Sequence, residues 1–154
     1  MGDLYEADIV LWSEQQSALL RRRAAGELVN EPALDWPNLA EEIESMGRAE
    51  RNELTNRLTV LLAHLLKWDV QPERRGRSWL LTIREQRLQA GRTLKQNPSL
   101  RPLLSEIMAD AYEVALISAK RETDLPEDAF PAECPWTFDR AMREELVLDQ
   151  DSFR

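Results

Sequence analysis

The chain has 154 residues, 43% of them hydrophobic and 31% charged, which is typical of a globular domain with its own core and excludes a disordered chain. The net charge of −8 disfavours nucleic acid and anionic membranes as partners. The single cysteine, Cys134, excludes an internal disulfide and fits a reducing cytoplasm. The N-terminus has no basic, apolar leader, and the longest apolar run, 60–66, is too short to span a bilayer. We therefore expect a cytoplasmic protein that does not enter the membrane.

Helical periodicity begins near the N-terminus. A first helix is predicted from about Asp3 or Asp8 to Ala25, with Asp8 as a candidate cap and Gly26 as its stop. Its apolar stripe comprises Leu4, Ile9, Trp12, Leu19 and Leu20.

A connector from Glu31 to Pro37 precedes a long second helix. The segment Asp35-Trp36-Pro37 predicts its start, and the pattern continues to about Asp69. Steps of three and four predict that one face is apolar along the whole helix. That face comprises Leu39, Ile43, Met46, Leu54, Leu58, Leu61, Leu62 and Leu65. Gly47 interrupts the helix and indicates a bend or a close helix contact.

Two further helices follow turns that contain proline. The third is predicted from a Ser78 cap to Gln96, with Trp79, Ile83, Ala90 and Leu94 on its inner face. The fourth is predicted from a Ser99 cap to about Glu122. Its inner face comprises Leu100, Leu104, Ile107, Ala111, Val114 and Ser118.

The C-terminal part cannot be one helix, because Pro126, Pro131 and Pro135 interrupt it. We expect a tail that packs through Leu125, Phe130, Trp136 and Phe138, followed by a short helix over 139–148. The predicted fold is therefore all-α. It is a single-domain bundle over 1–154, with four main helices, a long central helix, a Pro-rich C-terminal tail and a short last helix.

The strongest catalytic and cofactor motifs are absent from the sequence. There is no Gly-rich phosphate loop, no dinucleotide fingerprint and no Gly-x-Ser-x-Gly elbow. Because His64 is the only histidine, both the His-Glu-x-x-His zinc motif and the paired Glu-x-x-His motif of di-iron bundles are excluded. We therefore expect no metal and no cofactor.

Acidic residues at the start of the long helix form a first candidate group, Glu41, Glu42 and Glu44. Acids there complement the helix dipole and stay solvated, which is the structural interpretation. The functional interpretation is a carboxylate that binds a cation or pairs with Arg84 or Arg87.

A second candidate group lies on the second and third helices. It comprises His64, Lys67, Trp68, Trp79, Arg84, Glu85 and Arg87. The turn between the helices predicts that Trp68 and Trp79 stack, and an imidazole beside a carboxylate can act as a general base. The alternative is that His64 is a hydrogen-bonded core residue.

Positive charge is concentrated in residues 67–101, where nine basic residues against three acids leave +6, while the rest of the chain carries −14. Three interpretations stay open for this segment. It pairs with the protein's own acidic surface, it pairs with a second copy, or it binds an anion or nucleic acid.

The chain closely resembles the uncharacterised bacterial family known as domain of unknown function 29. The resemblance rests on an ordered series of motifs, namely Tyr5 to Trp12, Leu19 to Arg21, Leu34-Asp35, Asn38 to Met46, His64 to Trp68, Ser78-Trp79, Thr82 to Glu85 with Arg87, Pro98 to Leu100, Tyr112, Ala115, Ala119, Glu122-Thr123, Phe130-Pro131 and Cys134 to Trp136. It implies a helical domain from a bacterium and no particular activity. One departure is a longer connector near 27–32.

The sequence leaves the function unknown, and whether the protein is an enzyme stays open. The leading hypothesis is a non-enzymatic interaction or regulatory domain that binds a protein partner or a second copy. The first alternative is an enzyme with a His/Glu/Arg site that includes His64, Glu42 and Glu85 and acts on a small anionic substrate. The second is nucleic-acid binding through the basic segment.

Overall fold

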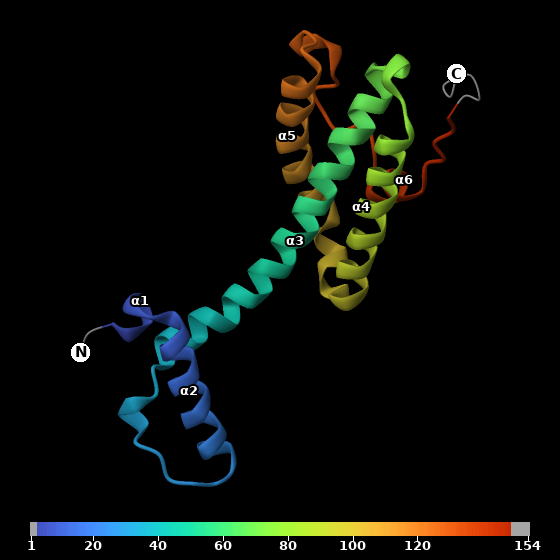
Figure 1. Cartoon of the computed structure of the whole chain (residues 1–154). Coiled ribbons are helices and arrows are strands. Elements are labelled where there is room, and N and C mark those ends of the chain that lie inside the picture. Colours follow the sequence, from blue (N-terminus) through green and yellow to red (C-terminus); the bar gives the residue numbers. More distant parts are fainter. Residues whose placement is uncertain (1–2, 149–154) are drawn as a thin grey trace. The chain divides into compact units, whose positions relative to one another are not determined.

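A computed structural model describes residues 3–148, and every regular element in that range is helical (Figure 1). The α-helices are α1 (Leu4–Ala7), α2 (Ile9–Ala24), α3 (Trp36–Val70), α4 (Arg77–Gln96), α5 (Leu104–Thr123) and α6 (Phe138–Arg143). Short 3₁₀ helices cover Glu31–Ala33, Pro72–Arg74, Pro98–Leu103 and Glu127–Ala129. This confirms the predicted all-α fold with a long central helix and a short last helix.

The chain divides into two compact units, residues 1–48 and 49–154. α1, α2 and the beginning of α3 belong to the first unit, and the rest of α3 with α4, α5 and α6 belongs to the second. The single domain over 1–154 stays a prediction, and its residues 1, 2 and 149–154 lie outside the described part.

The predicted first helix is two helices separated at Asp8. Asp8 is extended, with φ −154° and ψ 90°, and its carboxylate accepts a hydrogen bond from the Leu11 amide at 3.0 Å. Asp8 therefore caps α2, as predicted, while α1 forms a separate turn before it. After α2 ends, Gly26 has a φ of +83°, which only glycine adopts without strain.

The first part of α3 departs from the expected pattern. Ile43 is 69% exposed and Met46 is 70% exposed, although the periodicity predicted both in the core. α3 also runs through Gly47, where an added Cβ would meet nothing within 4 Å, so the predicted close contact is wrong. Periodicity identifies the apolar face of a helix, but it does not supply the element that covers that face.

The second unit contains a continuous core. The rest of α3, α4, α5 and the C-terminal tail contribute to it, and Phe130 and Trp136 are buried as predicted. Its fully buried large side chains are Leu54, Leu58, Leu61, Leu62, Leu65, Leu66, Ile83 and Ile107.

Both predicted serine caps are wrong. α4 begins one residue before Ser78, and the Ser78 carbonyl accepts from the Thr82 hydroxyl at 3.1 Å. Ser99 lies in the 3₁₀ helix, and α5 begins only at Leu104. Pro102 has no N–H to donate to a capping side chain three residues before it, which removes the main benefit of a cap at Ser99.

The inner face of α5 is also rotated relative to the prediction. Val114 is 53% exposed, and the buried face consists of Ile107, Met108, Ala111, Tyr112, Ala115, Ala119 and Thr123. Further along, α6 is shorter than the predicted helix over 139–148, because it ends at Arg143. It begins after Thr137, whose hydroxyl accepts a hydrogen bond from the Arg140 backbone N–H at 3.2 Å and caps the helix.

Candidate functional site

Lys67 is the most buried charged residue of the predicted second group, with 8% of its side chain exposed. Its ammonium forms a salt bridge with Glu122 of α5 and lies 5.3 Å from the centre of the Trp79 ring on α4. Two of the predicted residues, Lys67 and Trp79, are therefore brought together. Since the three residues come from three helices, this contact ties α3, α4 and α5 to one another.

His64 lies one turn before Lys67 on α3. Its Nδ1 is 2.9 Å from the Val60 carbonyl oxygen, which fits a neutral ring that donates from Nδ1. Burial lowers the pKa of His64 and outweighs the hydrogen bond to the Val60 carbonyl, which raises it. His64 is therefore neutral at physiological pH, and it lines none of the cavities described below.

The two indoles do not stack as predicted. The Arg75 guanidinium lies 5.3 Å from the Trp68 ring centre, and Arg75 Nε donates to the Trp68 carbonyl at 2.7 Å. Trp79 faces Lys67 instead. Within residues 3–148 the aromatic pair in ring contact is Tyr5 with Trp12, at 4.9 Å between centroids. Each predicted indole thus faces a cation, which is a favourable arrangement in itself.

Arg87 binds the C-terminal segment. Its Nε donates to the Ala141 carbonyl and its Nη2 to the Glu144 carbonyl, both at 2.9 Å. Arg84 and Glu85 are exposed on the same helix. Arg84 and Arg87 border a cavity of about 430 Å³ whose full lining is Leu80, Arg84, Arg87, Arg143, Glu144, Glu145 and Leu146.

The acidic group splits into two kinds of contact within the first unit. Glu41 and Glu44 form exposed salt bridges with Arg48, at 2.8 and 3.8 Å. Glu42 instead accepts a hydrogen bond of 2.6 Å from the Tyr5 hydroxyl, and this bond is the main reason that the pKa of Tyr5 rises to about 12. Glu42 therefore holds α1 on α3.

A polar network around Asp35 was not singled out by the sequence. One oxygen of its carboxylate accepts from Trp12 Nε1 and from the Asn38 amide, both at 2.8 Å. The Asn38 bond and then the Trp12 bond lower the pKa of Asp35, so it stays ionised. Buried Gln16 completes the network by accepting from the Asp35 N–H at 2.8 Å and donating to the Ala33 carbonyl at 3.1 Å.

This network borders a cavity of about 420 Å³ in the first unit. Trp12 and Asp35 were predicted only as a core residue and as part of a helix start. Since they are 23 positions apart, no local spacing joins them. The available signal was weak: Gln16 lies one turn after Trp12, and Asn38 lies three residues after Asp35.

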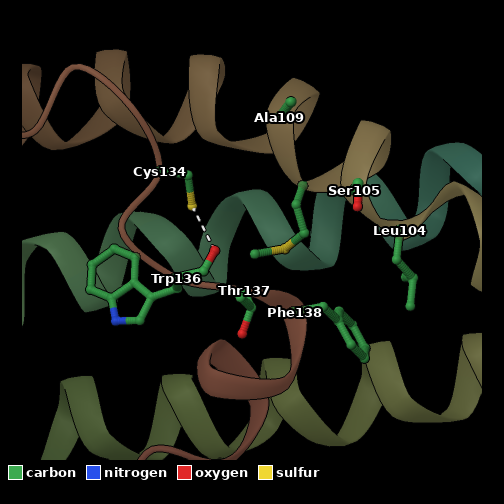
Figure 2. A pocket seen from close by; sticks show the side chains of 8 residues that line it. Leu104, Ser105, Ala109, Cys134, Trp136, Thr137 and Phe138 are labelled. Atoms are coloured by element: carbon green, nitrogen blue, oxygen red, sulfur yellow. Dashed lines mark hydrogen bonds between the residues drawn. The ribbon is translucent and has the colours of Figure 1, made fainter.

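A small apolar pocket of about 290 Å³ lies beside Cys134 in the second unit (Figure 2). The thiol donates to the Trp136 carbonyl at 3.3 Å, and burial raises its pKa. Ser105 and Thr137 also line the pocket. Because the thiolate is disfavoured, Cys134 behaves as a packed side chain.

The first unit leaves much of its apolar surface uncovered. Its exposed large hydrophobic residues are Ile9, Val10, Leu11, Leu20, Leu28, Trp36, Ile43 and Met46. By contrast, the residues classed as buried in this unit are Trp12, Gln16 and Leu34. A surface with this composition is typical of an interaction site.

The basic segment is mostly unpaired in the described part of the chain. Of its nine basic residues, Lys67 is the one that forms a salt bridge there, so pairing with the protein's own acids is limited. On α4, exposed Leu81 and Leu88 alternate with basic residues at steps of three and four. The basic residues of this face are Arg77, Arg84, Arg92 and Lys95, all exposed.

The comparisons with known proteins identify a family. The profile of the family described as Domain of unknown function DUF29 matches residues 4–147. No curated protein and no solved structure matches the chain at a significant level. In the part that the structure describes, no three His, Cys, Asp or Glu side chains gather as a metal site, and no helix is long and apolar enough to cross a membrane.

Proposed function

This chain belongs to the DUF29 family, whose description assigns no activity, and we propose from its surface that it is a non-enzymatic protein-interaction domain that binds a second copy of itself. We place it in the cytoplasm of a bacterium, which the single cysteine and the sequence resemblance support.

The uncovered stripe at the start of α3 carries this proposal. Trp36, Leu39, Ile43 and Met46 follow steps of three and four, so they share one helix face. Trp36 is 51% exposed, and Ile43 and Met46 are more exposed still. Helices pack against one another through apolar faces with this spacing. Here no element in the described part of the same unit covers the face.

The distribution of charge favours a second copy as the partner. Residues 1–48 contain ten acids and four basic residues, whereas residues 67–101 carry +6. One sequence therefore contains both an acidic, apolar surface and a basic one, and few of the basic charges are neutralised by salt bridges in the described part. Complementary charge favours association and fixes its orientation.

The contacts of the predicted site residues support a scaffold role over catalysis. Glu42 bonds Tyr5, Lys67 bonds Glu122, and Arg87 bonds backbone carbonyls. Each of these side chains is engaged in joining elements of the fold, and His64 bonds its own helix. The leucines between the arginines of α4 favour a protein partner over nucleic acid, because a phosphate backbone gains nothing from apolar side chains.

The test compares the oligomeric state of the wild-type chain, of a double variant on the stripe and of a single control variant in the second unit. We expect the wild-type chain to dimerise at micromolar concentration in light scattering coupled to size exclusion. Placing aspartates on the stripe, Ile43→Asp with Met46→Asp, removes about 3 kcal/mol or more of apolar burial and weakens the dimer at least about a hundredfold. Ile117→Asp is the control, because Ile117 is 57% exposed on α5 of the second unit.

Circular dichroism confirms that each variant keeps its helix content. A wild-type chain that stays monomeric up to sub-millimolar concentration would contradict the proposal. So would a dimer that is unaffected by the two substitutions on the stripe.

A further inference from the structure

We infer that the cavity between α4 and the segment that follows α6 binds a small organic anion, through the guanidinium groups of Arg84, Arg87 and Arg143. The cavity has a volume of about 430 Å³ and lies within the second unit. This inference concerns ligand binding by one chain and does not depend on self-association.

The three guanidinium groups come from two separate elements. Arg84 and Arg87 are one turn apart on α4, so they point from the same side of that helix. Arg143 ends α6 on the other side of the cavity. The sequence drew attention to Arg84 and Arg87, while Arg143 joins them only in the folded chain.

The positive charge of this cavity is only partly compensated. Arg87 uses Nε and Nη2 on neutral backbone carbonyls and has no carboxylate partner among the described residues. Arg84 forms no salt bridge there either, and Arg143 has only a 3.5 Å pair with Asp139 in which both side chains are at least 74% exposed. Such an exposed pair contributes little.

The carboxylates of the lining offset only part of this charge. Glu144 is directed to other partners, since its Oε2 accepts from Trp136 Nε1 at 2.9 Å and its Oε1 accepts from Arg140 at 3.2 Å. Glu145 is the second acid of the lining and is exposed. The lining therefore has three guanidinium groups against two carboxylates, and one of these carboxylates, Glu144, also binds Trp136 and Arg140.

Partial burial of Arg87 also favours the binding of an anion. Partial removal from water lowers the pKa of Arg87, although the nearby Glu144 opposes this change. A charged group in that position gains from any oxyanion that restores the lost solvation.

The lining also indicates the class of ligand. Planar guanidinium groups bind phosphate and carboxylate oxygens in pairs. Leu80 and Leu146 supply apolar walls beside them. An anion that carries an apolar portion, such as an organic phosphate or an aromatic carboxylate, satisfies both parts of the site.

The experiment titrates the full-length protein with phenyl phosphate and, separately, with benzoate. Both titrations keep the ionic strength constant with sodium chloride, and the Nε–H signals of the arginines are followed by NMR. We expect saturable shifts at Arg84 and Arg87. The probe that binds more tightly identifies phosphate or carboxylate as the preferred head group.

Two variants test whether the cavity is responsible. Arg84→Ala should weaken binding at least about tenfold, because it removes a charge-assisted contact. Arg143→Ala should act in the same direction. Arg92→Ala is the control, since Arg92 is exposed on the same helix and lies outside the cavity.

Arg87→Lys is preferable to removal of Arg87, because Arg87 also holds the C-terminal segment. The inference is wrong if neither probe gives a saturable shift, or if sodium chloride alone reproduces the shifts. It is also wrong if Arg84→Ala and Arg92→Ala bind the probes equally well.

Discussion

The two partners of the salt bridge between Lys67 and Glu122 should differ markedly in how much stability is lost when each is replaced. Glu122→Gln leaves the Lys67 ammonium buried without its carboxylate, whereas Lys67→Met removes the charge and keeps most of the apolar stem in the core. We therefore expect Glu122→Gln to destabilise the second unit more than Lys67→Met does.

The expected size lies between two limits. Breaking a fully buried pair costs about 3–5 kcal/mol, and exposed pairs are worth about 0.2–1 kcal/mol. The Lys67 side chain is 8% exposed, but that of Glu122 is 52% exposed, so water partly solvates the pair. This places Glu122→Gln at about 1–2 kcal/mol of lost unfolding free energy. Lys67→Met should cost less than about 1 kcal/mol, because a well-packed apolar residue often replaces a buried charge without loss.

Urea unfolding followed by tryptophan fluorescence measures this difference, since the Trp79 ring lies 5.3 Å from the Lys67 ammonium. In the double variant Lys67→Met with Glu122→Gln, the cost should fall below the sum of the single costs, because no unpaired charge is left. The reasoning is refuted if Lys67→Met is the more damaging single substitution, or if the two single costs simply add.

Three further predictions concern other contacts. Trp12→Phe removes the hydrogen bond to Asp35 and should cost the first unit about 1 kcal/mol in thermal unfolding, whereas Ser13→Ala, which removes an exposed hydroxyl hydrogen bond on the same helix, should cost almost nothing. The pKa of His64 is lowered from 6.5, so its contribution to stability is complete above pH 6.5 and is lost as the pH falls below that value. In His64→Gln, the unfolding free energy should therefore depend less on pH just below 6.5. An unchanged slope against pH would contradict this. Thr137→Ala removes the cap of α6 and should cost about 1 kcal/mol, seen as faster amide exchange at 138–143, with Thr82→Ala as an exposed-hydroxyl control.

Several elements could be predicted because their cause is local. Asp8 caps α2 through the amide three residues ahead, and Gly26 ends the helix through a φ that only glycine readily adopts. The same holds for the start of α3 at Trp36 and for the end of α4 at Gln96. In each case the deciding atoms lie within one turn of the chain.

Other features could not be predicted because their cause lies far along the chain. Trp12 meets Asp35, Lys67 meets Glu122, and Arg87 meets the carbonyls of 141 and 144. None of these distances follows from periodicity. The stacking predicted for Trp68 and Trp79 failed for a different reason, because each indole faces a nearby cation, Arg75 for Trp68 and Lys67 for Trp79.

The sequence by itself determined that the chain is helical, where α2, α3 and α4 lie to within about a residue, and which side chains are apolar on each face. Only the tertiary structure decided which of those faces are covered, and so it buried Leu54 and Leu58 while leaving Ile43 and Met46 on the same helix exposed. The physical reason is that helix formation depends on hydrogen bonds within one turn, whereas burial depends on whether a second element is present to exclude water from that face.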